Sequence, residues 1–282
     1  MEAVEEGRVA VEGGQVAYRV YGGGSRALLC VHGGPGCPSP SLGSLVDLAS
    51  DDMRVVLYDQ LGCGDSEAPD DPSLWALDRF VRELEQVRSA LDLGRIDLLG
   101  HSFGGVLAQE WALAHPDELR TLTLASTFCS VPQLRGELRR LAAELPDGQG
   151  APLLEGPSAP GHAEAHAAFS RAHLCRIPYP EPVRDALEHF AVPVYSRMWG
   201  TDSFTIEGTL RDWDVSDAIG VISAPTLITV GLYDEVTPAC AERMRERIDG
   251  SELIEFPSSA HLAHWEERDA FMACMRGFLQ NH

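Results

Sequence analysis

The pentapeptide at residues 100–104 places Ser102 between two glycines in the pattern Gly-x-Ser-x-Gly. The short apolar run 96–99 precedes it, and a helical pattern over 102–115 follows it until Pro116. The glycines permit a cramped strand-to-helix turn that projects the hydroxyl, and the amide groups at a helix start favour developing negative charge. We therefore predict that Ser102 is a nucleophile, the alternative being a serine that only caps the helix.

A serine hydroxyl needs a histidine base, and the base needs a carboxylate that orients it. Asp234 comes just after the apolar run 225–230, and His261 comes after the β-rich run 252–256. The chain order Ser, Asp, His is the one associated with this serine motif in parallel sheets. We predict Asp234 as the acid, although it could be only a turn residue, and His261 as the base. His264 is the alternative base.

A second glycine-rich loop, HGGPG at residues 32–36, follows the expected strand 26–31. Its glycines let the backbone approach a substrate closely, so an N–H group there can point at a developing oxyanion. We assign the predicted oxyanion hole to the backbone N–H groups of Gly34 and Phe103, the alternative for the loop being a turn without function. His32 is expected to organise the loop by hydrogen bonding, and Cys63 to be a small packed residue.

These residues need a scaffold that brings the ends of several strands together. Short β-rich runs alternate with helical patterns, which predicts an α/β fold with a mostly parallel sheet flanked by helices on both faces. In such sheets, functional residues collect at the carboxyl ends of the strands, where all three motifs fall. The expected strands are 15–21, 26–31, 53–58, 96–99, 119–125, 225–230 and 252–256, and the expected helices of this part are 77–91, 102–115 and a last one from about 265.

The pattern changes between residues 129 and 212. Helical stretches at 134–145, 163–174 and 182–190 surround a break at 148–161 that is rich in glycine and proline. We interpret 129–212 as a helical cap inserted into a core domain formed by 1–128 and 213–282. The alternative is a small domain that folds separately.

Composition limits the partners and the compartment. The net charge of −21 disfavours nucleic acid and anionic membranes, which are themselves polyanions. The seven cysteines are scattered without paired spacing, which suits a reducing compartment, and no apolar run is long enough for a membrane helix, so we expect a cytoplasmic location. No histidine and carboxylate cluster has ligand spacing, and the chain has no lysine for a phosphate loop, so neither a metal nor another cofactor is expected. The oligomeric state stays open.

Three segments together, HGGPG at 32–36, DQLGCGDS at 59–66 and GHSFGG at 100–105, resemble the α/β-hydrolase family and, within it, the prolyl aminopeptidases or proline iminopeptidases. The stretches 204–208, 211–214 and 225–231 are similar to the tricorn-interacting type in particular. The resemblance implies an α/β-hydrolase fold and the release of an N-terminal residue, preferentially proline, from short peptides. It also implies the same triad and oxyanion donors.

The resemblance further implies that Glu235, beside the predicted acid, binds the free ammonium group of the substrate. A desolvated ammonium group needs a fixed counter-charge, so a carboxylate there makes physical sense. The tricorn-interacting type presents a second glutamate from the cap where this chain has Ser203. A serine hydroxyl cannot supply that charge, and Asp202 or Glu207 would have to substitute for it.

Aromatic residues of the expected cap could line a pocket for the first side chain of the substrate. Trp199 and Phe204 are the main candidates, with Phe169 and Tyr195 beside them, and all of them could equally form the core of the cap. A substrate that is a short peptide or a small molecule with a free amine is therefore expected. The rival functions are an amidase or esterase that removes an aminoacyl or acyl group from a small molecule, and a binding protein that has lost catalysis.

Overall fold

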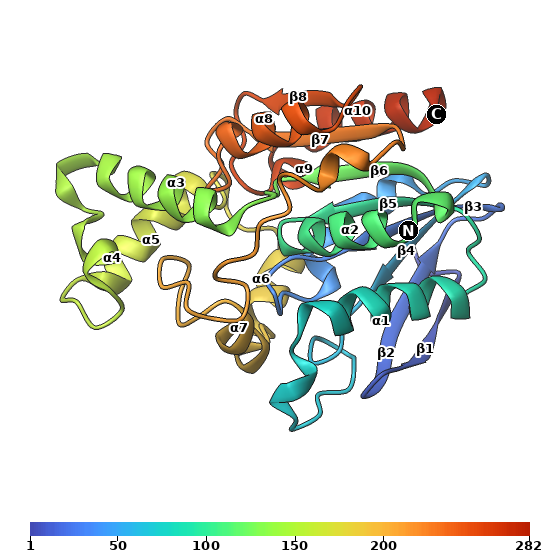
Figure 1. Ribbon diagram of the computed structural model, residues 1–282, viewed down its shortest axis with the longest axis horizontal. Coiled ribbons are helices and arrows are strands. Elements are labelled where there is room, and N and C mark those ends of the chain that lie inside the picture. The colour runs from blue at the N-terminus through green and yellow to red at the C-terminus, as the bar shows by residue number, and fades with distance from the viewer.

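The computed structural model describes residues 1–282 and is built around one eight-stranded sheet (Figure 1). The strand order is β1-β2-β4-β3-β5-β6-β7-β8. Strands β1 and β2 run antiparallel to their neighbours, and the others are parallel. The predicted α/β fold with a mostly parallel sheet is confirmed. The strands are β1 (Glu5–Val11), β2 (Gly14–Tyr21), β3 (Arg26–Val31), β4 (Met53–Tyr58), β5 (Ile96–His101), β6 (Leu119–Ala125), β7 (Thr226–Gly231) and β8 (Glu252–Phe256).

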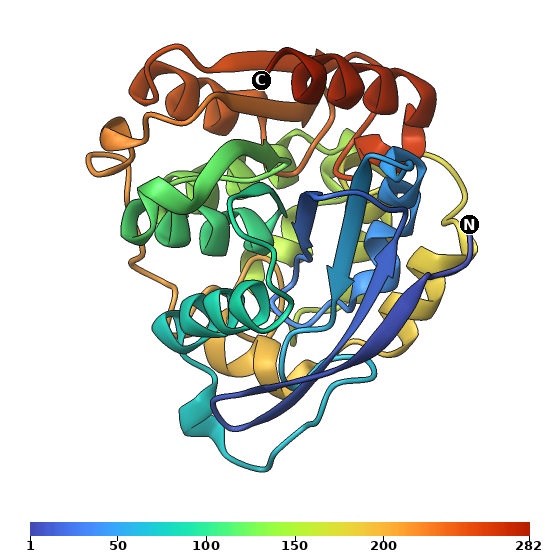
Figure 2. The same ribbon diagram turned by 90° about the vertical axis from the view of Figure 1, so that its right-hand side faces the viewer.

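Helices cover both faces of this sheet (Figure 2). Helices α1 (Leu77–Ala90), α2 (Phe103–Ala114) and α8 (Pro238–Arg247) pack in one apolar cluster, and the 3₁₀ segment η1 (Ser39–Leu48) packs with α10 (Arg268–Asn281) in another. Side chains of β3 alternate between the two: Leu29 and Val31 belong to the first cluster, Leu28 and Cys30 to the second. Successive side chains of a strand point to opposite faces, so an uninterrupted apolar strand fits a sheet that is covered on both sides.

The chain between β6 and β7 holds five further α-helices, which gather at one end of the sheet (Figure 1). They are α3 (Val131–Glu144), α4 (Ala151–Glu155), α5 (His162–His173), α6 (Glu181–Glu188) and α7 (Val192–Met198). The remaining short elements are η4 (Pro146–Gly148) and η5 (Ile219–Val221), also between β6 and β7, and η2 (Pro72–Leu74), η3 (Pro116–Glu118) and α9 (Ala263–Glu266) elsewhere in the chain.

The two ends of this inserted segment lie beside each other. The N–H group of Val131 donates to the carbonyl of Trp213 (2.9 Å), and that of Val215 donates to the carbonyl of Cys129 (2.9 Å). Apolar side chains of the segment also share one cluster of 53 buried residues with the sheet and its helices. Both observations support our proposal that 129–212 form a cap inserted into the core rather than a domain that folds separately.

Several elements differ from the sequence-based expectation, among them η1 and α8, which no expected element covers. Strand β1 was not expected because its Glu5, Glu6 and Gly7 suit an exposed edge that is held by backbone pairing with β2. Helix α7 was not expected either, and the expected break at 148–161 contains the short helix α4. Both helices carry proline in their first turn, where the missing N–H group costs nothing. No helix of the protein combines the length and the apolar character that crossing a membrane requires.

Candidate active site

Ser102 lies in the turn between β5 and α2, at the carboxyl end of a central strand. Its backbone is strained, with φ 54° and ψ −123°. The flanking glycines allow this turn to pack: a Cβ atom on Gly100 would come within 2.3 Å of the Gly104 carbonyl oxygen, and one on Gly104 within 2.0 Å of the Val31 carbonyl oxygen. The sharp turn predicted from the pentapeptide is therefore present, and it needs glycine on both sides.

The predicted base and acid contact each other beneath the cap. Nδ1 of His261 lies 2.7 Å from Oδ1 of Asp234, and both side chains are buried. The same Oδ1 accepts the N–H group of Val236 (2.8 Å). Because a carboxylate can only accept, Nδ1 carries the proton and Nε2 is left free to take one. Nε2 lies 4.0 Å from Oε1 of Glu235, which lines the same cavity as Ser102.

The alternative base, His264, lacks such a partner. It lies in α9, and its Nδ1 is 2.8 Å from Oγ of Ser44. Burial, together with His261, lowers the pKa of His264 to about 3. A buried imidazole without a carboxylate beside it resists protonation, so the geometry favours His261 as the base.

Two opposing effects set the protonation of His261. Burial disfavours its charged form, but the carboxylate of Asp234 and then that of Glu235 outweigh this and raise the pKa of His261 to about 9. Burial also raises the pKa of Glu235 to about 6, with His261 lowering it and Asp234 raising it. The two neighbouring carboxyl groups therefore favour the imidazolium form of His261, which has to release the proton from Nε2 before it can act as a base.

The predicted oxyanion donors line the cavity with Ser102. Gly34 belongs to the loop after β3, and Phe103 is the first residue of α2. Neither N–H group donates a hydrogen bond within the protein, since Gly34 lies outside the regular elements and the first N–H groups of a helix have no helical acceptor. Both donors are thus free for a substrate oxygen.

His32 organises the loop that carries Gly34, as expected. Its Nε2 accepts the N–H group of Gln60 (2.9 Å), its Nδ1 lies 3.0 Å from the carbonyl of Gly33, and the Gln60 amide donates to its carbonyl (2.9 Å). Cys63 is buried, and burial raises the pKa of its thiol. It has the character of a packed small residue, again as expected.

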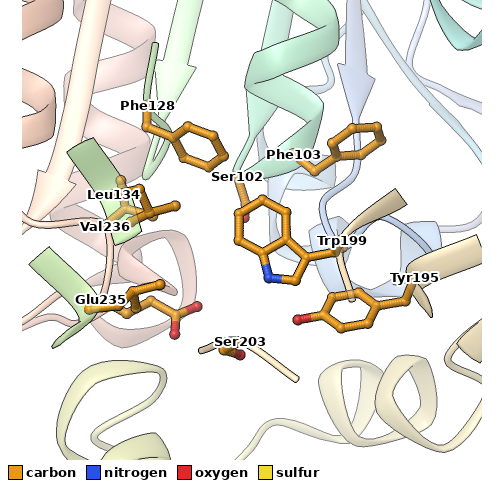
Figure 3. A pocket seen from close by; sticks show the side chains of 11 residues that line it. Ser102, Phe103, Phe128, Leu134, Tyr195, Trp199, Ser203, Glu235 and Val236 are labelled. Carbon is orange, nitrogen blue, oxygen red and sulfur yellow. The ribbon is translucent and has the colours of Figure 1, made fainter. Parts of the chain in front are cut away.

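The cavity at Ser102 has two unlike ends. Phe128, Leu134, Leu138 and Val236 form an apolar wall. In Figure 3 the oxygen atoms of Glu235, Tyr195 and Ser203 gather at the opposite end. A cavity of this kind can hold one charged or polar group of a ligand at one end and an apolar group at the other.

Only part of the predicted substrate-binding set reaches this cavity. Glu235 and Trp199 line it, whereas Asp202 and Phe204 do not. Oδ1 of Asp202 accepts the N–H groups of Phe204 (2.8 Å) and Thr205 (2.7 Å), which closes a turn, and its Oδ2 lies 3.3 Å from Nε2 of His162. The ring of Phe204 packs edge to face on Phe169 at 4.9 Å, within the cap.

The apolar wall was missed by the sequence analysis. Phe128 and Val236 lie just beyond β6 and β7, so the rule that sites collect at carboxyl ends of strands could have pointed to them. Leu134 and Leu138 are four residues apart on α3, which reveals a shared helix face but not what that face meets. No group of three or more His, Cys, Asp and Glu side chains is arranged to hold a metal ion.

The α/β-hydrolase fold family matches residues 26–268 of this chain. The chain belongs to the α/β-hydrolase family. Among the relatives of this α/β hydrolase, the proline iminopeptidase of Saccharolobus solfataricus is 40% identical over 98% of this chain and 92% of its own length. That of Thermoplasma volcanium is 37% identical over 99% and 97%. The resemblance inferred from the sequence motifs is thereby confirmed.

Two solved structures are also similar over their full lengths. The proline iminopeptidase of Mycobacterium smegmatis has a TM-score of 0.92 and 30% identity, covering 99% of this α/β hydrolase and 98% of its own chain. The protein VinJ has a TM-score of 0.93 and 30% identity, covering 99% of both chains. The likeness therefore extends through the cap as well as the sheet.

Proposed function

We propose that this protein is a serine aminopeptidase that releases an N-terminal residue, proline or another small residue, from peptides or aminoacyl amides. The observation that carries the proposal is the cavity itself, in which the partly buried carboxylate of Glu235 shares a small space with Ser102. Such a carboxylate suits a substrate whose free ammonium group lies close to the bond that is cut. The activity in the names of the relatives supports the same choice.

The proposed mechanism is acyl transfer through a covalent intermediate. His261 takes the proton of Ser102, whose oxygen attacks the carbonyl carbon of the first residue. The negative oxygen that forms accepts the free N–H groups of Gly34 and Phe103. His261 then gives its proton to the departing amine, and a water molecule activated by the same histidine hydrolyses the acyl-enzyme.

A second candidate is an amidase or esterase that acts on a small molecule. Ser203 lines the polar end of the cavity, where the sequence resemblance implied a second carboxylate, so Glu235 is the single carboxylate there. One carboxylate holds an ammonium group less firmly than two, and the apolar wall can accept an acyl chain. In this reading, ester cleavage would not depend on a free amine.

Replacing Glu235 by glutamine separates the two functions. For substrates with a free amine we expect kcat/KM to fall about 10- to 100-fold, mainly through KM, because a charged hydrogen bond to the ammonium group is lost. Cleavage of an acyl ester without an amine should change little when each variant is assayed on its own pH plateau. The measurement is steady-state kinetics on prolyl and alanyl anilides and on a simple acyl ester.

The matched control is Glu207→Gln. Glu207 is exposed on the cap and does not line the cavity, so its removal should leave kcat/KM for both substrates unchanged. A Glu207 variant as impaired as the Glu235 variant would instead place the ammonium site on the cap. Equal loss on the ester and the anilides would favour the amidase or esterase reading.

The pH dependence of ester cleavage tests the coupling between Glu235 and the base. The pKa of His261 is raised to about 9. With an amine-free ester, kcat/KM should therefore rise with pH as His261 loses its proton. In Glu235→Gln the rising limb should move to lower pH by about one unit or more, because removal of a nearby negative charge disfavours the imidazolium. An unmoved limb would contradict this coupling. By the same reasoning, a bound ammonium group should help His261 to release its proton.

We also propose a small amine-bearing molecule or short peptide as the partner and a reducing, cytoplasmic setting. All seven cysteines are free and five of them are buried, which supports a reducing compartment. The net charge of −21 favours cationic over anionic partners.

A further inference from the structure

The C-terminal end of the cap helix α5 contacts the loop that carries the proposed acid, Asp234. The carbonyl of His173 accepts the N–H group of Glu235 (3.0 Å), and its side-chain Nδ1 lies 2.9 Å from the carbonyl of Tyr233. Because that carbonyl can only accept, Nδ1 is the donor. The guanidinium group of Arg176 also stacks on the ring of Tyr233 at 3.7 Å. The residues on both sides of Asp234 are thus held from the cap.

The same short segment contacts the loop of the proposed base. The carbonyl of Leu174 accepts the N–H group of His261 itself (3.2 Å). The N–H group of Arg176 donates to Oε2 of Glu266 (2.8 Å). Oε1 of Glu266 in turn accepts the N–H groups of the two residues that flank His261 (3.0 and 3.1 Å). The backbone around the base is therefore fixed directly and through one carboxylate.

The acid and the base follow different strands, β7 and β8, so the 2.7 Å contact between them depends on how their two loops lie relative to each other. Residues 173–176, which we call the cap brace, bond to both loops. We propose that the cap brace holds Asp234 and His261 in their productive arrangement, and that His173 is a positioning residue for catalysis. This inference rests on the proposed triad.

His173 is the member of the brace that can be tested by substitution. The other hydrogen bonds of the brace to the two loops come from backbone groups, which a change of side chain leaves in place, and the one further side-chain contact is the stacking of Arg176 on Tyr233. The imidazole of His173 is half-buried, and besides donating to Tyr233 it packs on the ring of Phe169 at 4.8 Å. A substitution can therefore remove either the donor or the ring contact separately.

The experiment compares His173→Leu, His173→Gln and His173→Asn on an amine-free acyl ester, so that binding of ammonium by Glu235 does not enter. Leucine keeps apolar bulk but has no donor, and the glutamine amide reaches the position of Nε2 rather than Nδ1. Asparagine loses the ring contact but keeps an N–H group near the position of Nδ1. We expect kcat to fall about 10- to 100-fold in the leucine and glutamine variants with KM little changed, and to be restored to within about threefold in the asparagine variant.

The pH profile gives a reading that a general loss of stability would not produce. Asp234, Glu235 and Glu266 are the carboxylates that act on His261, and the rings of His101 and His264 lie near it. If the acid loop shifts away in the leucine and glutamine variants, the rising limb of kcat/KM should move to lower pH. In the asparagine variant the rising limb of kcat/KM should lie at the same pH as in the unmodified protein.

Two results would overturn the inference. One is unchanged kcat and an unmoved limb in the leucine and glutamine variants, and the other is an equal fall in the asparagine variant, which would assign the effect to the ring. Melting temperatures identify a variant that fails to fold, and the glutamine and asparagine pair then decides the question. If Ser102→Ala is inactive and the His173 variants have normal kcat, only the positioning role of the cap brace is refuted. If Ser102→Ala is active, the proposed function itself is refuted.

Discussion

Replacing Ser102 by alanine is expected to lower kcat for anilides and esters by about 10⁵- to 10⁶-fold, because the members of a serine triad act as one unit. The residual rate should come from the free N–H groups of Gly34 and Phe103 and from binding alone. Folding should be retained, since alanine meets the same backbone strain as serine at φ 54°. The checks are steady-state kinetics and a thermal melt of the purified variant.

Covalent labelling provides the control for this variant. A phosphonate probe should attach to Ser102 in the unmodified protein and not at all to Ser102→Ala, as read by peptide mass spectrometry. Ser216→Ala, which removes a buried hydroxyl bonded to Asp214 outside the cavity, should label normally. Residual activity above about 1% in Ser102→Ala, without labelling elsewhere, would contradict a serine mechanism.

The second large effect is expected for Asp234→Asn, with kcat falling about 10⁴-fold. Oδ1 of Asp234 now receives both the Nδ1 proton of His261 (2.7 Å) and the N–H group of Val236 (2.8 Å). An asparagine can turn its NH₂ group towards Nδ1 of His261, so that the proton of the imidazole lies on Nε2. Nε2 then cannot accept the proton of the Ser102 hydroxyl. The lost charge also removes a cause of the raised pKa of His261.

Two measurements separate these effects from a loss of stability. The small activity that remains in Asp234→Asn should show its rising limb at lower pH than the unmodified protein. Asp97→Asn is the matched control, because Asp97 is a buried carboxylate of β5 that pairs with Arg26 away from the cavity (2.6 and 2.9 Å). It should lower the melting temperature and leave kcat/KM within about twofold. An Asp234 variant with similarly mild kinetics would remove it from the triad.

The fold and the proposed triad could be predicted because both depend on local patterns. Apolar strands that alternate with helices define a covered parallel sheet, and the carboxyl ends of its strands meet at one edge. Any chemistry-bearing residue that follows such a strand is therefore brought near the others. Ser102, Asp234 and His261 each follow a strand in this way, and the glycines beside Ser102 mark the turn without any knowledge of distant contacts.

The arrangement of the cap could not be predicted from local patterns, because its helices are positioned by packing on one another and on the core. Asp202 and Ser203 are neighbours in the chain, yet the first closes a turn while the second lines the cavity. Which of two neighbouring side chains reaches the cavity depends on the path of the backbone, and residue types alone do not determine that path. The same holds for Leu134 and Leu138, whose helical spacing shows that they share a face but not that this face lines a cavity together with Phe128.

The serine chemistry was thus determined by the sequence itself, since the residue types and their positions after strands were sufficient to identify Ser102, Asp234 and His261 as candidates. The tertiary structure decided what surrounds them: a cavity with one carboxylate at Glu235, an apolar wall from separate segments, and bonds from residues 173–176 to the loops that carry Asp234 and His261. These features join residues that are far apart in the chain and include backbone N–H and carbonyl groups, which every residue type carries. A pattern of side chains therefore cannot reveal them.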